Sequence, residues 1–193
     1  DMDDGGALHY KKCIDKVHEM CPKVGIEFLC SDLSGNVNAL EFLLDNSPLT
    51  VFAHNVETVR RLTPRVRDPR ATFDQSLLIL KKAKDFRPDI ITKTSIMLGL
   101  GETEEDLLSA FRELRDAKVD LLTLGQYLSP GPRYHPVVSF PSPETFDSLA
   151  QIAKEMGFKA IASGPMVRSS YRAESLVAAA KGETFDIELK VVA

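Results

Sequence analysis

Helical and strand patterns alternate along almost the whole chain, and this alternation limits the possible folds more than any other feature of the sequence. In the helical segments apolar residues recur every three or four positions, whereas the strand segments are short, apolar and rich in β-branched residues. Such an alternation predicts a parallel sheet with right-handed crossovers. The predicted strands are residues 25–30, 50–54, the first part of 90–102, 121–127 and 159–163.

Capping residues mark the starts of the predicted helices. Asn36, Thr72, Thr103 and Ser142 are favourable N-cap residues, and each precedes a segment with an apolar face. The predicted helices are residues 7 to about 21, a segment after 36, residues 72 to about 86, a segment after 103, a segment between 142 and 157, and a short segment that ends at about 180.

Residues 90–102 form the centre of this pattern. Their first part suits a strand covered on both faces, and Gly99 and Gly101 follow just before a helix begins. Glycines let the main chain approach a ligand, and Glu102 adds a carboxylate at the same turn. The third glycine of a dinucleotide fingerprint is absent. The sequence therefore favours a partial parallel (β/α) barrel, truncated at its N-terminal strands, over the classical dinucleotide-binding fold.

Composition excludes several classes of protein. With 193 residues, 44% of them hydrophobic, the chain can bury one core, and we expect one domain over residues 1–180 and a tail at 181–193. A net charge of -4 without a long Lys/Arg run argues against a nucleic-acid surface, and no apolar run is long enough for a membrane span. The first residue is not Met, and no targeting signal is recognisable. We expect part of a longer, cytoplasmic protein, or a mitochondrial or plastid one in a eukaryote.

The three cysteines match no common metal motif. Cys13, Cys21 and Cys30 are odd in number, and their spacings fit neither a zinc pair nor an iron–sulfur run. Cys13 and Cys21 share a helical stripe with Ile14. We therefore predict reduced thiols that are buried as small hydrophobes.

Polar residues follow each predicted strand. In α/β sheets the carboxyl ends of the strands carry the functional groups, so we predict a ligand site on this rim. The polar clusters are Ser31-Asp32, His54-Asn55-Val56-Glu57, Gly99-Leu100-Gly101-Glu102, Gln126-Tyr127 and Arg168-Ser169-Ser170-Tyr171.

Some polar residues also have structural interpretations. His54 closes an apolar strand and is expected to be a hydrogen-bonded core residue, and the other three histidines are expected at the surface. Lys93 lies inside a strand, where it is either a salt-bridged lysine or an amine that serves as Schiff-base nucleophile or anion anchor. The arginines of residues 60–70 either form a solvated basic loop or hold an anionic substrate or cofactor.

Six short motifs connect the chain to a known family. They are Asp3-Asp4-Gly5-Gly6-Ala7, His54-Asn55-Val56-Glu57-Thr58, Val66-Arg67-Asp68-Pro69-Arg70-Ala71, Met97-Leu98-Gly99-Leu100-Gly101-Glu102-Thr103, Leu122-Thr123-Leu124-Gly125-Gln126-Tyr127 and Ala162-Ser163-Gly164-Pro165-Met166-Val167-Arg168-Ser169-Ser170-Tyr171. From its first residue to about Ala173 the chain resembles the lipoyl synthases, a family of radical S-adenosylmethionine (SAM) enzymes.

The resemblance implies a partial (β/α)6 barrel that binds SAM and two [4Fe-4S] clusters. One cluster cleaves SAM to a radical that removes hydrogens from C6 and C8 of an octanoyl chain, and the auxiliary cluster donates the sulfur. The implied partners are an octanoylated lipoyl-carrier domain, of the H protein or E2 subunit type, and an electron donor such as ferredoxin or flavodoxin.

The resemblance also implies site residues. Ser95 stands at the first glycine of the family's adenine-lining motif, and Ser170, with Ser169 as the alternative, matches the family's serine ligand to an iron of the auxiliary cluster. Arg168 and Ser170 are the predicted catalytic residues. The predicted cofactor-binding residues are Asn55, Glu57, Lys93, Ser95, Met97, Gly99, Gly101, Glu102 and Gln126.

The chain departs from the family in two places. Both cysteine runs of the family are absent, so we expect them upstream and expect this chain, as the C-terminal two thirds, to be inactive alone. In the loop 128–136, His135 is displaced by one position from the family pattern. Two alternatives are a Schiff-base lyase or aldolase that uses Lys93, and a non-catalytic barrel fragment that binds a nucleoside or a carrier domain.

Overall fold

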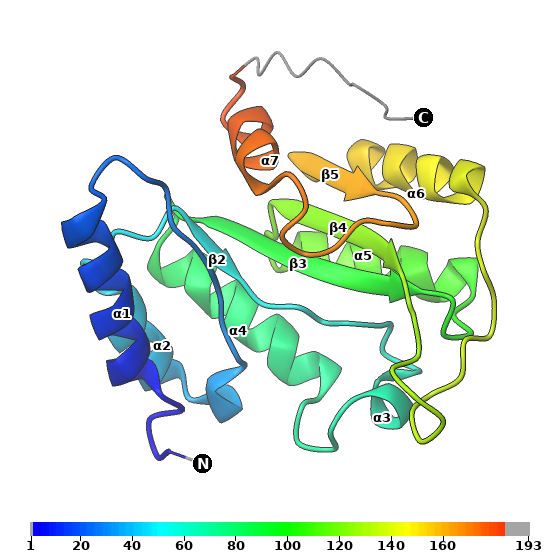
Figure 1. The fold of residues 1–193 in the computed structure, drawn as a ribbon, viewed down its shortest axis with the longest axis horizontal. Coiled ribbons are helices and arrows are strands. Elements are labelled where there is room, and N and C mark those ends of the chain that lie inside the picture. Colours follow the sequence, from blue (N-terminus) through cyan, green and yellow to red (C-terminus); the bar gives the residue numbers. More distant parts are fainter. Residues whose placement is uncertain (1, 184–193) are drawn as a thin grey trace.

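The computed structural model describes residues 2–183, and its centre is one sheet of five parallel strands in the order β1-β2-β3-β4-β5 (Figure 1). Because this order is the chain order, every crossover steps in the same direction, as in a barrel, and no topological switch point occurs. The partial-barrel prediction agrees with this arrangement. The strands are β1 (Glu27–Leu29), β2 (Val51–Ala53), β3 (Ile91–Leu98), β4 (Leu121–Gln126) and β5 (Ala160–Ser163).

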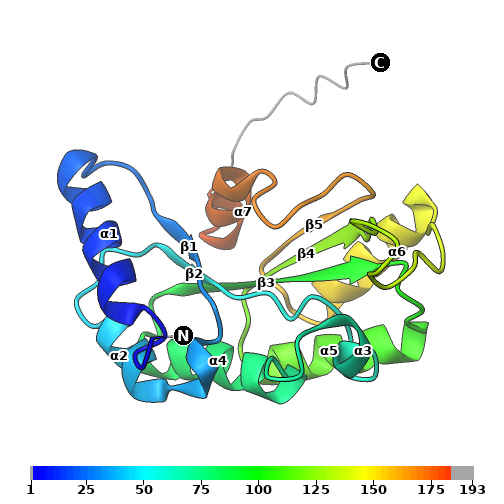
Figure 2. The same cartoon turned by 60° about the horizontal axis from the view of Figure 1, so that its bottom comes forward.

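Helices connect these strands and cover the sheet unequally. Figure 2 shows α4 and α5 on one face of the curved sheet and α7 on the opposite face. The helices are α1 (Ala7–Met20), α2 (Val37–Leu44), α3 (Thr63–Val66), α4 (Phe73–Phe86), α5 (Glu104–Asp116), α6 (Pro143–Glu155) and α7 (Ala173–Ala180). Of the helices in residues 2–183, none combines the length and the apolar character that a membrane crossing needs.

Side-chain caps fix the predicted helix starts. The Thr72 hydroxyl accepts a hydrogen bond from the Gln75 amide at 3.1 Å, and Thr103 forms a reciprocal capping box with Asp106. The Asn36 side chain caps α2 in the same way. The strand predictions are confirmed, although β1 and β2 are shorter than predicted. The sequence pattern missed α3, which is only one turn long and lies within the basic segment.

The strands bury apolar side chains on both faces. Ile96 packs on the helix-covered face with Phe111 of α5, whereas Ile91 packs on the other face with Leu176 of α7. Successive strand residues point to opposite faces, so this burial explains the continuous apolar character of β3. The inward positions nearer the carboxyl end of β3 are polar or flexible: Lys93, Ser95 and Met97. The sheet is therefore sealed at its amino end by α7 and is polar toward its carboxyl end.

The prediction that the cysteines are buried is wrong for two of the three. All three are free thiols, and Cys30 is buried, but Cys13 and Cys21 are exposed. The buried stripe of α1 runs through Ala7 and Ile14, one position away from Cys13, and Cys21 lies just beyond the last helical residue. A one-residue step turns a helical side chain by about 100°, which explains the difference.

Asp120 joins three elements at the amino end of the sheet. Its carboxylate accepts hydrogen bonds from Lys84 Nζ at 2.7 Å, from Lys159 Nζ at 2.9 Å and from the Thr92 amide at 3.0 Å. Burial alone would raise the pKa of Asp120, but these hydrogen bonds outweigh it and hold the pKa below its ordinary value. This ion-pair cluster is the main charged contact between α4, β3 and β4.

Replacing Asp120 by Asn is expected to lower the free energy of unfolding by roughly 3 kcal/mol, because Lys84 then loses its buried counter-charge. Since the folded pKa is lowered, the stabilisation from Asp120 is complete above the unfolded pKa of about 3.9 and is lost as the pH falls through the folded value. Urea denaturation measures both effects. Asp116→Asn, at an exposed position, is the control, and equal stability of the two variants would contradict this account.

Candidate functional site

Two adjoining cavities lie at the carboxyl ends of the strands and share Asn55 and Glu57. Cavity A has a volume of about 200 Å³ and cavity B about 360 Å³. The predicted rim therefore contains two cavities whose walls share Asn55 and Glu57. The further lining residues of cavity A are Ser95, Met97, Gly125, Gln126, Leu128, Val167, Arg168 and Ser169. Those of cavity B are Leu29, Cys30, Ser31, Asp32, His54, Arg67 and Ala71.

Glu57 is held at the centre of this site by its main chain. Its amide donates to Ser95 O at 3.1 Å, and its carbonyl accepts from the Met97 amide at 2.8 Å. The residue has a left-handed φ of 66°, a conformation that costs a non-glycine residue of the order of 1 kcal/mol. The segment after β2 thus pairs in parallel with the end of β3 through Glu57 and Ile96, in one fixed register.

The side chains of Asn55 and Glu57 form a partly buried polar pair. Burial raises the pKa of Glu57, whereas a hydrogen bond from Asn55 and the charge of Arg67 oppose the rise. Among the described residues, Asn55 Oδ1 has no hydrogen-bond partner, although it is buried. A buried acceptor without a partner is costly, so a donor on a ligand is the natural partner for this atom.

Gly125 allows the C-terminal segment to approach the sheet. A Cβ atom at this position would overlap with the carbonyl oxygen of Val167. The approach places Arg168 and Ser169 in the wall of cavity A, whereas Ser170 is exposed and lies outside that wall. Arg168 Nη1 donates to Val167 O at 2.8 Å. Sequence reasoning missed Gly125, although a glycine inside a buried strand is a signal of close backbone approach.

Gln126 lines cavity A but uses its amide group to hold the main chain. Its Nε2 donates to Tyr127 O at 2.9 Å, to Ser139 O at 3.1 Å and to Leu98 O at 3.2 Å. These contacts fix the loop that follows β4 against the end of β3. Gln126 therefore shapes the wall, and its predicted contact with a cofactor stays a prediction.

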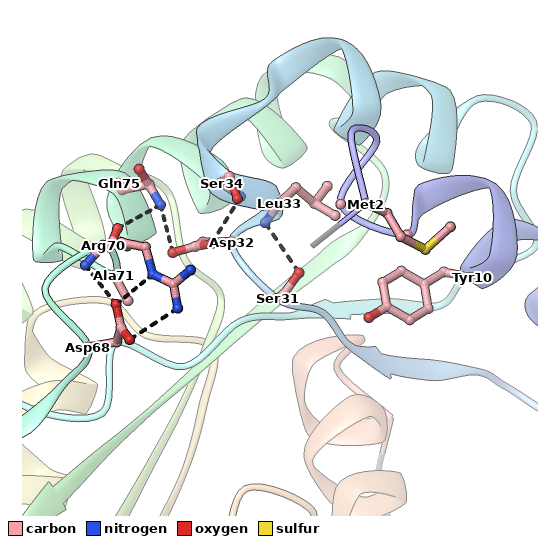
Figure 3. Close-up of a pocket in the computed structure, with 12 residues that line it drawn as sticks. Met2, Tyr10, Ser31, Asp32, Leu33, Ser34, Asp68, Arg70, Ala71 and Gln75 are labelled. Carbon is pink, nitrogen blue, oxygen red and sulfur yellow. Dashed lines mark hydrogen bonds and ion pairs between the residues drawn. The ribbon is translucent and has the colours of Figure 1, made fainter.

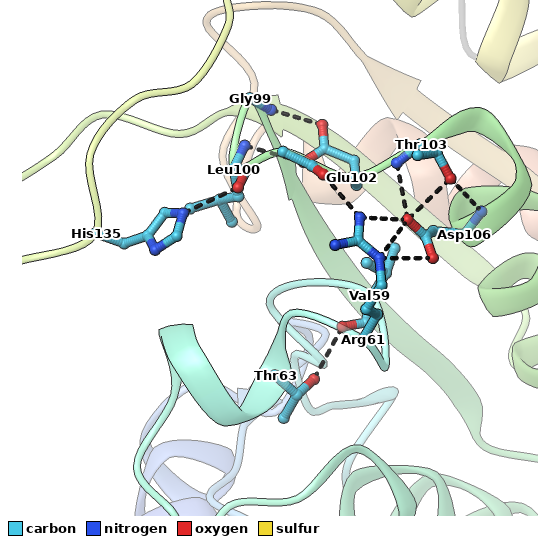
Figure 4. A network of polar contacts seen from close by, with 10 residues as sticks. Val59, Arg61, Thr63, Gly99, Leu100, Glu102, Thr103, Asp106 and His135 are labelled. Atoms are coloured by element: carbon cyan, nitrogen blue, oxygen red, sulfur yellow. Dashed lines mark hydrogen bonds and ion pairs between the residues drawn. The ribbon is translucent and has the colours of Figure 1, made fainter.

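The glycine turn after β3 is stabilised from within. Glu102 accepts hydrogen bonds from the Gly99 amide at 2.7 Å and from the Leu100 amide at 2.9 Å (Figure 4). Gly99 has a φ of 96°, and a Cβ atom there would overlap with Gln126 and with Ser139 O. Gly99, Gly101 and Glu102 were predicted to bind a cofactor, but none of them lines cavity A or B. In this structure they form the turn that supports Ser95 and Met97.

Figure 4 also shows what surrounds this turn. Arg61 donates to Gly101 O at 2.8 Å and pairs with Asp106 at 2.7 Å. His135 Nε2 lies 2.9 Å from Leu100 O, so the prediction of a surface histidine without partners is wrong at this position. The proline-rich loop is thereby attached to the glycine turn through His135.

Lys93 is the salt-bridged lysine of the two sequence interpretations. Its side chain is 1% exposed, and Nζ lies 2.8 and 2.9 Å from the two carboxylate oxygens of Glu27. It lines neither cavity A nor cavity B. A Schiff-base nucleophile needs an accessible, neutral amine, and a buried ion pair provides neither.

The basic segment is largely neutralised. Arg60 pairs with Asp74 and Glu113, Arg61 with Asp106, and Arg70 with Asp68. The sequence allowed either a basic loop or an anion site here, and these ion pairs match the first interpretation. Arg67 differs, because it points inward and lines cavity B.

A third cavity, cavity C, adjoins cavity B near the N-terminus. Its volume is about 680 Å³, and it shares Ser31, Asp32 and Ala71 with cavity B. Figure 3 shows Asp32 bound by Gln75, with Tyr10 on the opposite side of the cavity. Within this wall Asp32 is engaged by Gln75, and Asp68 by Arg70.

Comparison with known proteins identifies the class. Residues 2–114, more than half of the chain, match the family described as the Radical SAM superfamily. The chain belongs to this superfamily.

Three of the most similar relatives are all named lipoyl synthases. The chain is 52% identical over 174 residues to the lipoyl synthase of Thermus thermophilus, covering 90% of this chain and 54% of the relative. It is 51% identical over 174 residues to the lipoyl synthase of Marinobacter nauticus, covering 90% and 50%, and 53% identical over 173 residues to the apicoplast lipoyl synthase of Toxoplasma gondii, covering 90% and 32%. The chain thus spans about half the length, or less, of these curated relatives.

Replacing Gly125 by Ala is expected to displace residues 164–171 and to destabilise the chain by about 1–3 kcal/mol, because the new methyl group overlaps with Val167 O. Hydrogen exchange of the amides in 165–171 should increase. Gly131→Ala is the control, since a Cβ atom there meets only a Tyr134 carbon at 3.9 Å. Unchanged exchange in the Gly125 variant would show that the close approach is not needed.

Proposed function

We propose that this chain forms the SAM-binding part of a lipoyl synthase, which inserts sulfur at C6 and C8 of a protein-bound octanoyl group. The observation that carries the proposal is the shared wall of cavities A and B. There, the unpartnered Asn55 Oδ1 and the Glu57 carboxylate lie beside Ser95 and Met97, with Ser169 also in the wall of cavity A.

The hydrogen-bond acceptors and apolar side chains of cavity A fit the nucleoside part of SAM. Ribose hydroxyls are donors that match the oxygens of Asn55 and Glu57, and the flat apolar adenine matches Met97 and Leu128. Glu57 accepts best as a carboxylate, so the groups that oppose its protonation also favour binding. Together with a reduced iron–sulfur cluster, SAM supplies radical chemistry that can break an unactivated C–H bond.

The described residues do not by themselves hold an iron–sulfur cluster. Within residues 2–183, no group of three His, Cys, Asp or Glu side chains is placed to bind a metal ion. From the family's serine ligand we assign this chain one cluster ligand, Ser170, with Ser169 as the alternative. We assign the remaining ligands to the part of a lipoyl synthase that this chain does not span, since it covers about half the length of its relatives. A serine oxygen is a hard ligand among thiolates and is suited to be the one released.

The further parts of the function rest on the same proposal. The substrate is an octanoylated lipoyl-carrier domain of the H protein or E2 subunit type, and the electron donor is a ferredoxin or flavodoxin. The proposed location is cytoplasmic, or a mitochondrion or plastid in a eukaryote, and one relative is named as an apicoplast protein. The buried Lys93 pair argues against the Schiff-base lyase alternative, and a non-catalytic fragment that binds a nucleoside or carrier would share the SAM site but not the cluster ligand.

Calorimetry with SAM and the full-length protein tests the nucleoside site. Asn55→Ala and Glu57→Gln should each weaken binding roughly tenfold or more, because each removes an acceptor for a ligand hydroxyl. Glu105→Gln, at an exposed position of α5, is the matched control and should bind as the parent does. Normal affinity of both site variants would place the nucleoside elsewhere.

Iron analysis and Mössbauer spectra of the iron-loaded full-length protein test the serine ligand. Ser170→Ala should alter the signal of the auxiliary cluster and lower its iron content, and Ser170→Cys should restore the content because thiolate binds iron more strongly. Ser169→Ala is the neighbouring control. If only the Ser169 variant changes the spectrum, the ligand is Ser169, and if neither does, the serine assignment is wrong.

A further inference from the structure

We propose that Arg67 is a positioning residue of the ligand site, which holds Glu57 as a charged acceptor and is itself held by Ser76 and His54. The inference rests on the proposed use of Glu57 for ligand binding and deepens it. Four elements meet here: the ends of β1 and β2, the residue after α3, and the first turns of α4.

With a neutral His54, the hydrogen bonds around Ser76 have only one consistent direction. Arg67 Nη1 donates to Ser76 Oγ at 2.8 Å, since a guanidinium has no acceptor. His54 Nδ1 lies 2.9 Å from Cys30 O, which can only accept, so Nδ1 carries the hydrogen. His54 Nε2, 2.9 Å from Ser76 Oγ, is then the acceptor for the serine hydroxyl in a neutral histidine. Each of the three donors, Arg67 Nη1, the Ser76 hydroxyl and His54 Nδ1, thus has one acceptor in this series.

Charge favours the same arrangement. Burial lowers the pKa of His54, and the nearby Arg67 lowers it further, whereas Cys30 O and Asp32 act in the opposite direction. A charged His54 would place two cations on the single Ser76 oxygen. His54 is 4% exposed and Ser76 is fully buried, so no solvent screens such a contact. The neutral histidine can therefore serve as a fixed acceptor for the Ser76 hydroxyl.

The hydrogen bond to Ser76 holds Arg67 in the wall of cavity B, which Glu57 also lines. A long hydrogen bond of 3.5 Å from Arg67 Nη1 to Val56 O brings the guanidinium beside the neighbouring main chain. Burial lowers the pKa of Arg67 and raises the pKa of Glu57, and the charge of each residue opposes the shift of the other. Unlike Arg60, Arg61 and Arg70, Arg67 makes no direct salt bridge within the described part of the chain. Its charge remains available to the site.

The groups that act on Glu57 are therefore few. Asn55 donates to it, Arg67 attracts it, and burial opposes its charge. Asp32, which also lines cavity B, attracts Arg67 but is already engaged by Gln75 Nε2 at 2.7 Å and by the Ser34 amide. Removing Arg67 leaves burial dominant, so Glu57 should take up a proton at a higher pH than in the parent protein.

The test compares Arg67→Met, Arg67→Lys and Ser76→Ala in the full-length protein, with Arg65→Met as control because Arg65 is exposed in the same segment. SAM affinity is measured at about pH 6 and about pH 8. We expect the Arg67→Met variant to lose about tenfold more affinity at the lower pH, Arg67→Lys to recover most of this difference, and Ser76→Ala to show a smaller loss of the same kind. The control should follow the parent.

A loss that is equal at both pH values, and equal in the Met and Lys variants, would overturn the proposal and reduce Arg67 to a structural residue. Urea denaturation of each variant identifies any that fails to fold, and Ser76→Ala, the smallest change, then decides. A carbon-13 NMR titration of the Glu57 carboxyl, assigned with Glu57→Gln, needs no ligand. If the parent protein does not bind SAM, the proposed function fails, and the titration still shows whether Arg67 lowers the pKa of Glu57.

Discussion

The attachment of Glu57 to the end of β3 is the constraint on which the site depends. Two main-chain hydrogen bonds, to Ser95 O and from the Met97 amide, hold the chain after β2 alongside the neighbouring strand in parallel pairing. The left-handed φ at Glu57 is a local cost that these bonds and the buried Val56 offset. Without this attachment, cavities A and B would not share a wall, and the carboxylate would not lie between them.

Three supports keep this attachment in place, and each comes from a different part of the chain. The glycine turn after β3, closed by Glu102, fixes the strand that receives Glu57. The contact of Val167 O with Gly125 brings the C-terminal segment over cavity A. The series from Arg67 through Ser76 to His54 fixes the opposite side at cavity B. A site built from several strand ends in this way is typical of parallel barrels, because their carboxyl ends converge on one rim.

Much of the fold could be predicted from the sequence, because strands and capped helices leave local patterns. The order of elements and the caps at Thr72 and Thr103 depend on residues only a few positions apart. The exposure of Cys13 was missed because helical spacing alone cannot tell which of two adjacent residues faces the core. Here the neighbouring Ile14 is buried and Cys13 is exposed. Of the tail predicted at 181–193, only residues 181–183 lie within the described part of the chain.

The position of the two cavities could be predicted from the sequence, whereas the contacts of the individual side chains could not. Asn55, Glu57, Ser95, Met97 and Gln126 do line the cavities, since strand ends must meet at one edge. The hydrogen bonds that Glu102 accepts from the Gly99 and Leu100 amides could not be predicted. The pattern G-x-G-E is equally compatible with a carboxylate that binds a ligand. The sequence could not distinguish Arg67 from the paired arginines around it. Its distinguishing feature is a hydrogen bond to Ser76, which lies on a different element.

The most direct measurement is a crystal structure of the full-length protein with 5′-deoxyadenosine and methionine, the two halves of cleaved SAM. The account predicts ribose oxygens within hydrogen-bond distance of the Glu57 carboxylate and of Asn55, with the adenine against Met97. Nucleoside density in cavity C, or anywhere away from the wall shared by cavities A and B, would contradict it.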